Sequence, residues 1–207
     1  MSYCTFAPDH PVHGPYHGHE YGFPIDDESA LFERLVLEIN QAGLSWLTIL
    51  TKRENFRVAF DNFDIDKVAG YGTRERSRLL ADTGIIRNRL KVDAAITNAR
   101  RLIELRQTHG SFAGWLDAHH PLDKPAWVKL FKQTFAFTGG EITGEFLLST
   151  GYLPGAHDET CPVYRTIARL KPPWLRAARR SAPPGAGKIL PVSQSTPRKI
   201  RSAAPKP

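Results

Sequence analysis

The sequence of 207 residues contains only two cysteines, Cys4 and Cys161, which lie at opposite ends of its folded part. It also lacks an apolar run of the roughly 20 residues that a membrane-spanning helix needs. Its first residues have neither a basic start nor the apolar centre of a signal peptide. These absences predict a cytosolic protein that does not span a membrane. A disulfide is unfavourable in that compartment, so the cysteines are either buried bystanders or metal ligands.

Acidic residues are missing from the last part of the chain. Residues 171–207 contain nine Lys or Arg, eight of the sixteen prolines and no Asp or Glu. Residues 1–170 have a net charge of −2, although the whole chain carries +7. We therefore expect one domain over residues 1–170, followed by a disordered basic tail. The tail either adds affinity for phosphates or is a passive extension.

The sequence also lacks convincing alternation of apolar and polar residues, and it contains no internal repeat, so it predicts an all-α body. Four prolines in residues 1–25 predict a loop-like opening. Helices are expected over residues 28–43, 46–50, 55–60, 64–69, 74–81, 87–107, 125–134 and 141–149, with a further short helix that Ser111 caps.

The run from Leu37 to Trp46 is the most informative stretch. Glu38 lies on the edge of an apolar helical stripe, Gly43 can end that helix, and Ser45 can cap the next one. This corner would bring an acid, an exposed Leu44 and an aromatic ring together, which are the parts needed to extrude a base from duplex DNA. The alternative is structural: Glu38 forms a salt bridge, and Leu44 and Trp46 pack in the core.

A second corner follows at residues 82–86, between two predicted helices. Gly84 permits a tight turn, and Arg87, Arg89 and Lys91 follow at the start of the next helix. A helix-hairpin-helix has this outline and points backbone N–H groups at a DNA phosphate. A plain antiparallel helix pair would give the same pattern.

Two pairs of metal-binding residue types stand at the two ends of the body. Cys4 and His17 lie in the opening segment, and His157 and Cys161 lie four residues apart after the last predicted helix. Together they make the two-thiolate, two-imidazole set of a structural zinc site, which would also hold the opening segment in place. The competing ligands are His10, His13 and His19.

With these parts assembled, the chain resembles the 3-methyladenine DNA glycosylase I family over residues 1 to 161. The resemblance rests on Cys4, the segment Tyr16-His17-xx-Glu20-x-Gly22-x-Pro24, Leu37-Glu38 with Gln41-Ala42-Gly43-Leu44-Ser45-Trp46 and Lys52-Arg53-Glu54, Gly84-Ile85-Ile86-Arg87-x-Arg89-x-Lys91 with Asn98-Ala99, Phe135-x-Phe137-x-Gly139 and His157-xxx-Cys161.

This resemblance implies a helix-hairpin-helix glycosylase fold that acts on damaged double-stranded DNA, and we expect a monomer. It implies zinc held by Cys4, His17, His157 and Cys161. Glu38 would hydrogen-bond the methylated adenine as the catalytic residue of the pocket, and Tyr16 and Trp46 would stack on the base. The corner at Gly43 and Leu44 would enter the DNA, with Gly84, Arg87, Arg89 and Lys91 at the phosphates.

The chain departs from the family in three respects. Phe6 and Tyr21 stand where the family usually has Trp, and His13 stands where it has Tyr. After Gly139, Gly140-Glu141 replaces the expected small hydroxylated residues. Phe6, His13 and Tyr21 are expected at the rim of the base pocket. Two alternatives therefore stay open, a glycosylase for another modified base and a noncatalytic, zinc-stabilised DNA-binding protein.

Overall fold

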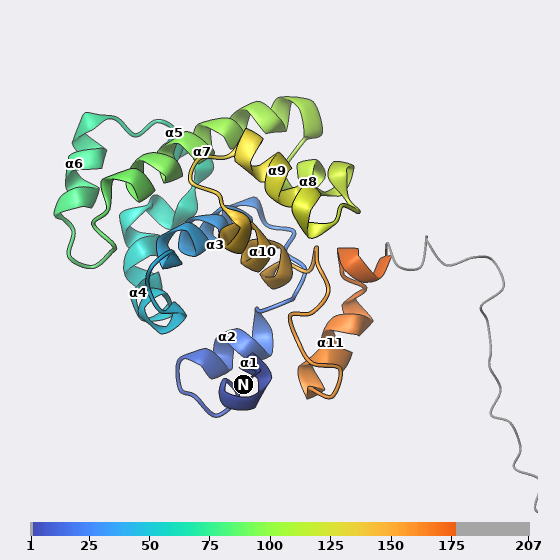
Figure 1. Cartoon of the computed structure of the whole chain (residues 1–207). Coiled ribbons are helices and arrows are strands. Elements are labelled where there is room, and N and C mark those ends of the chain that lie inside the picture. Colours follow the sequence, from blue (N-terminus) through green and yellow to red (C-terminus); the bar gives the residue numbers. More distant parts are fainter. Residues whose placement is uncertain (1, 177–207) are drawn as a thin grey trace, which may run out of the picture.

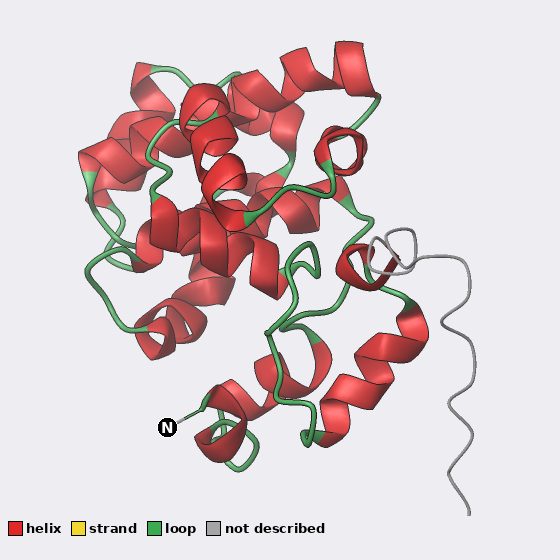
Figure 2. Cartoon of the chain, turned by 45° about the vertical axis from the view of Figure 1, so that its right-hand side comes forward, coloured by secondary structure: helices red, strands yellow, loops and turns green. Residues whose placement is uncertain are grey.

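Helices account for all the regular secondary structure of residues 2–176, the part of the chain that the computed structural model describes (Figure 1). Within this range no strand occurs, so the predicted all-α class is confirmed (Figure 2). The elements are α1 (Tyr3–Phe6), α2 (His13–His19), α3 (Glu28–Gln41), α4 (Trp46–Ala59), η1 (Asp61–Phe63), α5 (Ile65–Ala69), α6 (Thr73–Ala81), α7 (Arg89–His109), α8 (Phe112–His119), α9 (Lys124–Thr134), α10 (Gly140–Ser149) and α11 (Pro162–Leu170).

Helix α3 is the centre of the fold. The Asp27 side chain caps it by accepting the N–H of Ala30 at 2.7 Å, as the sequence predicts. All ten residues from Leu31 to Asn40 are buried, because α4, α7, α8 and α10 surround the helix. Glu38 is therefore fully enclosed, whereas its predicted place on the edge of the apolar stripe would have left it partly exposed.

Helix α4 is continuous, whereas the sequence predicted two short helices in the same region. Ser45 caps it by accepting the N–H of Thr48 at 3.1 Å, as expected. No glycine or proline interrupts residues 46–59, and the polar segment Lys52-Arg53-Glu54 consists of good helix formers. The break in apolar periodicity was therefore misleading.

The opening segment is not the loop that its prolines predicted, because α1 and α2 form within it. Pro15 lies in the first turn of α2, where a missing N–H costs no helical hydrogen bond. Helix α11, which begins with Pro162, was missed for the same reason. Figures 1 and 2 show α1, α2 and α11 together on the side of the molecule opposite α5, α6 and α7.

Helices α6 and α7 are joined by residues 82–88. The Asn88 side chain caps α7 by accepting the N–H of Leu90 at 3.0 Å, so this helix begins at Arg89, two residues later than predicted. In the turn, Gly84 donates its N–H to the Asp82 carboxylate at 2.7 Å.

Main-chain bonds tie both ends of the described chain to the end of α10. Gly22 donates to the Ser149 carbonyl at 2.9 Å, and Trp174 donates to the Gly151 carbonyl at 3.1 Å.

The predicted basic tail falls mostly on residues 177–207, which lie outside the described residues. None of the helices within residues 2–176 has the length and apolar character that crossing a membrane requires.

Candidate active site and metal centre

A cavity of about 260 Å³ lies where five helices converge. Glu38 and Gln41 come from α3, Trp46 from the start of α4, and Tyr16 from α2. The remaining lining residues are Tyr3, Tyr21 and Glu145. The sequence predicted Glu38, Tyr16, Trp46 and Tyr21 at such a site and missed Tyr3, Gln41 and Glu145. Tyr3 and Glu145 lie more than 100 residues apart, and no local pattern connects them.

Glu38 is 3% exposed and lies deep in this cavity. Burial raises the pKa of its carboxyl to about 8, because desolvation disfavours the charged form. Arg34 opposes this rise, and the Glu145 carboxylate adds to it. The Glu38 side chain is therefore largely protonated at neutral pH when no cation is bound.

Aromatic rings form the walls of the cavity. The Tyr16 and Trp46 rings lie 5.2 Å apart in an edge arrangement, and the Tyr16 and Tyr21 rings lie 5.8 Å apart. The indole N–H of Trp46 is buried and has no hydrogen-bond partner among the described residues. These rings offer faces for a planar ligand beside the Glu38 carboxyl.

A buried arginine fixes the position of Tyr16. Arg34 donates to the Tyr16 hydroxyl at 2.8 Å and pairs with Glu20 at 3.2 Å. Glu20 also pairs with Arg53 at 2.6 Å, which connects α4 to the segment after α2. Arg53 in turn pairs with Glu33 at 2.6 Å. The alternative prediction that Glu38 forms a salt bridge is wrong. Arg34 and Arg53 pair with Glu20 and Glu33 instead.

Phe6 and His13 do not line the cavity, contrary to their predicted place at its rim. Both pack on Tyr3, with ring centroids 5.3 and 5.6 Å away, and His13 Nδ1 is hydrogen-bonded to the Tyr3 hydroxyl at 3.0 Å. Tyr3 lines the cavity, and Phe6 and His13 contact it without lining the cavity themselves.

The corner between α3 and α4 has the predicted geometry. Gly43 has a φ of +81°, which a residue with a side chain rarely adopts, and the Leu44 side chain is 41% exposed. The buried Lys91 ammonium donates to the carbonyls of Asn40 at 2.8 Å and Ala42 at 2.6 Å. It satisfies carbonyls at the end of α3 that would otherwise be unpaired.

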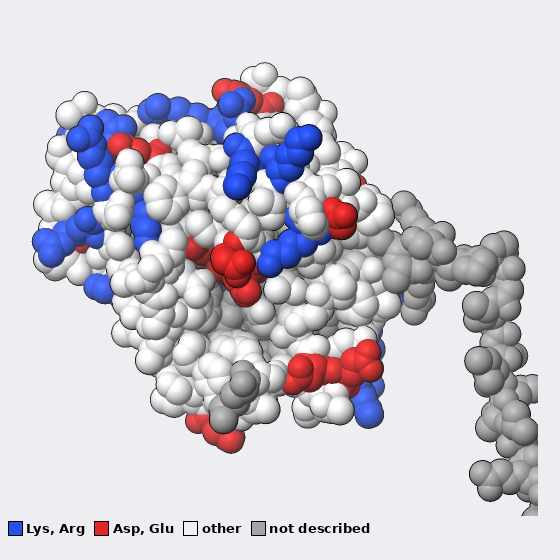
Figure 3. All heavy atoms as spheres, in the orientation of Figure 1, with Lys and Arg blue, Asp and Glu red and all other residues white. Residues whose placement is uncertain are grey.

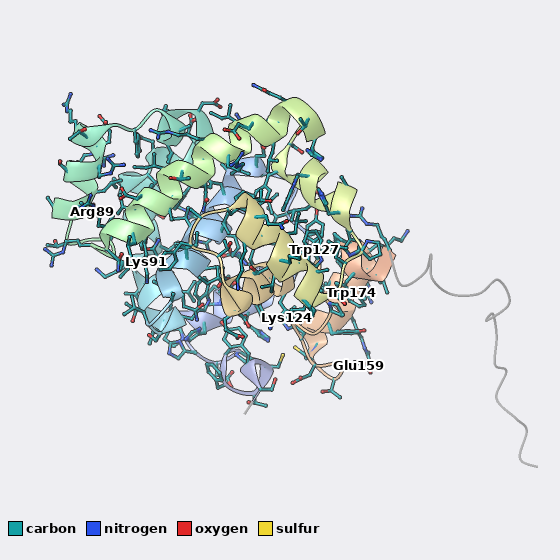
Figure 4. All side chains as sticks on the ribbon, turned by 45° about the horizontal axis from the view of Figure 1, so that its top comes forward. Arg89, Lys91, Lys124, Trp127, Glu159 and Trp174 are labelled. Atoms are coloured by element: carbon teal, nitrogen blue, oxygen red, sulfur yellow. The ribbon has the colours of Figure 1, made fainter. Side chains whose placement is uncertain are left out.

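The predicted phosphate-contacting residues thus separate into two groups. Lys91 is 4% exposed, so the interpretation of this residue as a surface contact is corrected: it holds the α3–α4 corner. Arg87 and Arg89 are exposed near the turn that contains Gly84. Figure 4 shows Arg89 at the outer edge of the molecule. Lys52 donates to the Gly84 carbonyl at 3.1 Å and so connects this turn to α4.

Charge is distributed unevenly around these features. In Figure 3, acidic side chains gather near the centre of the displayed face, above a hollow, whereas basic side chains spread over α6, α7 and α9. A cation would therefore be attracted towards the hollow, and a polyanion towards the helices beside it.

The four predicted metal ligands form one cluster. Their ligand atoms all lie within 4.8 Å of one another, so the group can hold a metal ion. His157 Nδ1 lies 3.6 Å from the sulfurs of both Cys4 and Cys161, and the Cys161 sulfur lies 3.8 Å from His17 Nε2. Ligands at about 2.3 and 2.05 Å from a tetrahedral ion would be about 3.6 Å apart. The competing histidines, His10, His13 and His19, are not part of the group.

The cluster also has an outer hydrogen bond that would orient a ligand. His157 Nε2 lies 2.7 Å from the Tyr21 carbonyl, so this nitrogen donates and leaves Nδ1 free to face the sulfurs. The residues present therefore fit a tetrahedral ion both in the chemistry of the donors and in their separations.

Comparison with known proteins agrees with this geometry. The profile of the family described as methyladenine glycosylase matches residues 6–134. DNA-3-methyladenine glycosylase of Haemophilus influenzae is 30% identical in an alignment 178 positions long, which covers 77% of this chain and 96% of the relative. The chain belongs to the methyladenine glycosylase family. DNA-3-methyladenine glycosylase 1 of Escherichia coli is 42% identical over 116 residues, which are 56% of this chain but only 62% of that relative.

A solved structure extends the likeness of this family member beyond the profile. The structure that describes 3-methyladenine recognition by 3-methyladenine DNA glycosylase I from Staphylococcus aureus superposes with a TM-score of 0.70 at 33% identity. It covers 79% of this chain and 96% of the other. The profile itself includes Tyr16, Glu38 and Trp46 but ends before Glu145 and the His157–Cys161 pair.

Proposed function

We propose that this member of the methyladenine glycosylase family is a monofunctional DNA glycosylase of base excision repair. It extrudes an alkylated purine, 3-methyladenine, from damaged double-stranded DNA and hydrolyses the N-glycosidic bond, which leaves an abasic site. The observation that carries the proposal is the meeting of Glu38, Tyr16 and Trp46 in one cavity beside the exposed Leu44. A pure DNA-binding protein has no use for such a cavity.

The chemistry of the base suits these side chains. An adenine alkylated at N3 is cationic in DNA, so its glycosidic bond is weak and the base leaves as a neutral ring with little help from an acid. The faces of Tyr16 and Trp46 and the Glu38 carboxylate attract such a cation. Because the charge disappears on cleavage, these contacts select the bound base more than they stabilise the transition state.

The rate enhancement then comes from positioning the sugar and the attacking water, and from the negative field of the phosphates around the positive sugar that develops. Glu38 is the catalytic residue in the sense that it contacts and orients the base. No lysine lines the cavity, which supports hydrolysis by water without a Schiff base and without strand cleavage.

Two corners are proposed to bind the duplex. Leu44 fills the gap that the extruded base leaves, and Lys91 holds the corner in shape. The turn between α6 and α7 acts as a helix-hairpin-helix, with the backbone around Gly84 and the exposed Arg87 and Arg89 at a phosphate.

The metal is proposed to be a structural zinc ion bound by Cys4, His17, His157 and Cys161. Two thiolates and two imidazoles in a closed set are the ligands that such zinc sites take. The ion would join the opening segment to residues 157–161 and would take no part in the reaction.

A direct test is to incubate the protein with methylated duplex DNA and identify the released base by mass. Release of 3-methyladenine with intact strands is the expected result. A different released base would make the protein a glycosylase of another specificity. Binding of DNA without release of any base would make it a noncatalytic binding protein and overturn the proposal.

A further inference from the structure

The base cavity contains a second carboxyl group that the sequence did not single out. Glu145 projects from α10 into the cavity that Glu38 enters from α3. The Tyr21 hydroxyl donates to one Glu145 oxygen at 3.3 Å and so holds the side chain against the aromatic wall. Glu145 is only half-buried, so it lies nearer the opening than Glu38 does.

Neither carboxyl forms an ion pair among the described residues, because the nearby cations have other partners. Arg34 is engaged by the Tyr16 hydroxyl and by Glu20. Lys124, which Figure 4 labels at the start of α9, passes beside Gly144, and its ammonium lies 4.0 Å from Glu141; it is not among the lining residues of the cavity. Arg34 of α3 acts on the charge of Glu38, and Glu141 of α10 and Lys124 of α9 act on that of Glu145. The other titratable groups of the lining are the hydroxyls of Tyr3, Tyr16 and Tyr21.

Two acidic groups without a bound cation disfavour each other's ionisation. Burial raises the pKa of Glu145, although the Tyr21 hydrogen bond and the Lys124 charge oppose this rise, and the Glu145 charge contributes to the raised pKa of Glu38. A cation that arrives between them relieves this repulsion, whereas a neutral ring of the same shape does not. The second carboxyl therefore discriminates by charge, which stacking on Tyr16 and Trp46 does only weakly.

We propose that Glu145 is a further specificity-determining residue and that, with Glu38, it makes the cavity selective for positively charged purines over neutral purines of the same shape. This rests on the proposed function and names its substrate class as purines that carry a positive charge after alkylation of a ring nitrogen. Tyr21 acts as the positioning residue for Glu145.

The test compares two small ligands that differ in charge and not in shape. The 3,9-dimethyladeninium ion is a cationic analogue of the damaged nucleoside, and 3-deaza-3,9-dimethyladenine is its isostere, uncharged when the pH is held above its own pKa. Titration calorimetry gives the affinity of the holoprotein for each. The wild type is expected to prefer the cation, and Glu145→Gln should reduce this preference by about tenfold, since a partly buried charge pair is worth at least that much.

Two matched variants complete the test. Glu54→Gln removes the same charge from a side chain that is 77% exposed and outside the cavity, and it should keep the wild-type preference. Glu145→Asp keeps the negative charge and should retain most of the wild-type preference for the cation. An unchanged preference in Glu145→Gln, an equal loss in Glu54→Gln, or a wild type that binds both ligands equally overturns the proposal.

The release assay distinguishes failure of the proposed function from failure of the role of Glu145. If the wild type releases no base from methylated DNA, the proposed function fails. If it releases 3-methyladenine but Glu145→Gln keeps the wild-type preference for the cation, only the role of Glu145 fails.

Discussion

The metal cluster and the base cavity have much in common, although they recognise different partners. Each is built from the opening segment together with a residue or pair near the other end of the described chain, and each gathers groups that need a positive partner. The cluster is closed, with four donor atoms within 4.8 Å of one another. The cavity is open and has a volume of about 260 Å³ for a ligand. This difference fits the partners proposed for them, a permanently bound metal ion for the closed cluster and a cationic base that enters and leaves for the open cavity.

Tyr21 connects these two regions. Its carbonyl accepts a hydrogen bond from His157, a proposed metal ligand, and its hydroxyl donates to Glu145 in the cavity. A disturbance of the cluster should therefore reach the cavity, whereas the reverse effect should be small. Variants of each region can test this asymmetry.

The largest effect is expected from removing the ion. Cys161→Ala should abolish stoichiometric zinc binding and destabilise the protein by several kcal/mol, because the ion closes the contact between the two ends of the body. Metal analysis and the melting temperature, each with and without a chelator, measure this. His19→Ala is the control, since His19 is exposed and outside the cluster. Full stability of the chelated wild type would refute a structural ion.

Glu38→Gln changes the cavity without touching the cluster. It should keep stoichiometric zinc and should weaken the discrimination between 3-methyladenine and normal adenine by about tenfold, which is more than it lowers turnover. Competition kinetics on DNA that carries both bases measures the discrimination. If the variant keeps the wild-type discrimination, Glu38 has no role in selecting the charged base.

The same variant should show how the buried carboxyl affects stability. The pKa of Glu38 is about 8 in the folded protein, against an ordinary value of 4.5 for glutamate, so the folded state holds the proton more tightly than the unfolded state does. The contribution of Glu38 to wild-type stability should therefore fall as the pH rises from about 4.5 to about 8, by an amount on the order of 5 kcal/mol. Glu38→Gln lacks this loss, so its advantage in denaturant unfolding should be absent at low pH and should grow towards pH 8. The exposed Glu54 gives the control, Glu54→Gln.

Leu44→Ala should leave both regions intact and affect only the duplex. We expect unchanged zinc content and unchanged affinity for the free base, with excision from duplex DNA slowed by about tenfold because the vacated gap is no longer filled. Val58→Ala, at an exposed position near the other end of α4, should have no effect. Equal losses in free-base binding and excision would place Leu44 in the cavity wall.

The smallest effect is expected at the surface charges. Arg89→Ala should reduce the salt dependence of DNA binding by about one counterion, because an exposed guanidinium neutralises one phosphate. Lys91→Met should weaken excision through the corner without changing that slope, since the ammonium is buried on carbonyls. Equal slopes for Arg89→Ala and the wild type would remove Arg89 from the DNA interface.

Local sequence chemistry predicted much of the fold. Caps at Asp27, Ser45 and Ser111 located helix starts, because a short polar side chain binds the free N–H groups there. Helices α2 and α11 were missed, since their prolines lie in first turns, where the residue does no harm. Helix α4 was predicted as two helices in error. Its residues keep a high helix propensity where the apolar periodicity stops.

The cavity was only partly predictable. Glu38 and Trp46 stand close together in the sequence, so their pattern could be recognised. Glu145 is one acidic residue on an ordinary helix, and only tertiary packing brings it opposite Glu38. The role of Lys91 was wrong for a related reason: a basic residue after a turn suggests a phosphate contact, but its four-carbon stem reaches inward to the end of α3.

The double attachment of Tyr21 has a physiological consequence. Because one residue both receives the bond from His157 and orients Glu145, growth under metal starvation should yield molecules whose damage recognition is impaired before their reaction chemistry is altered. Repair capacity for alkylated DNA would then follow the nutritional supply of the ion as well as the amount of protein made.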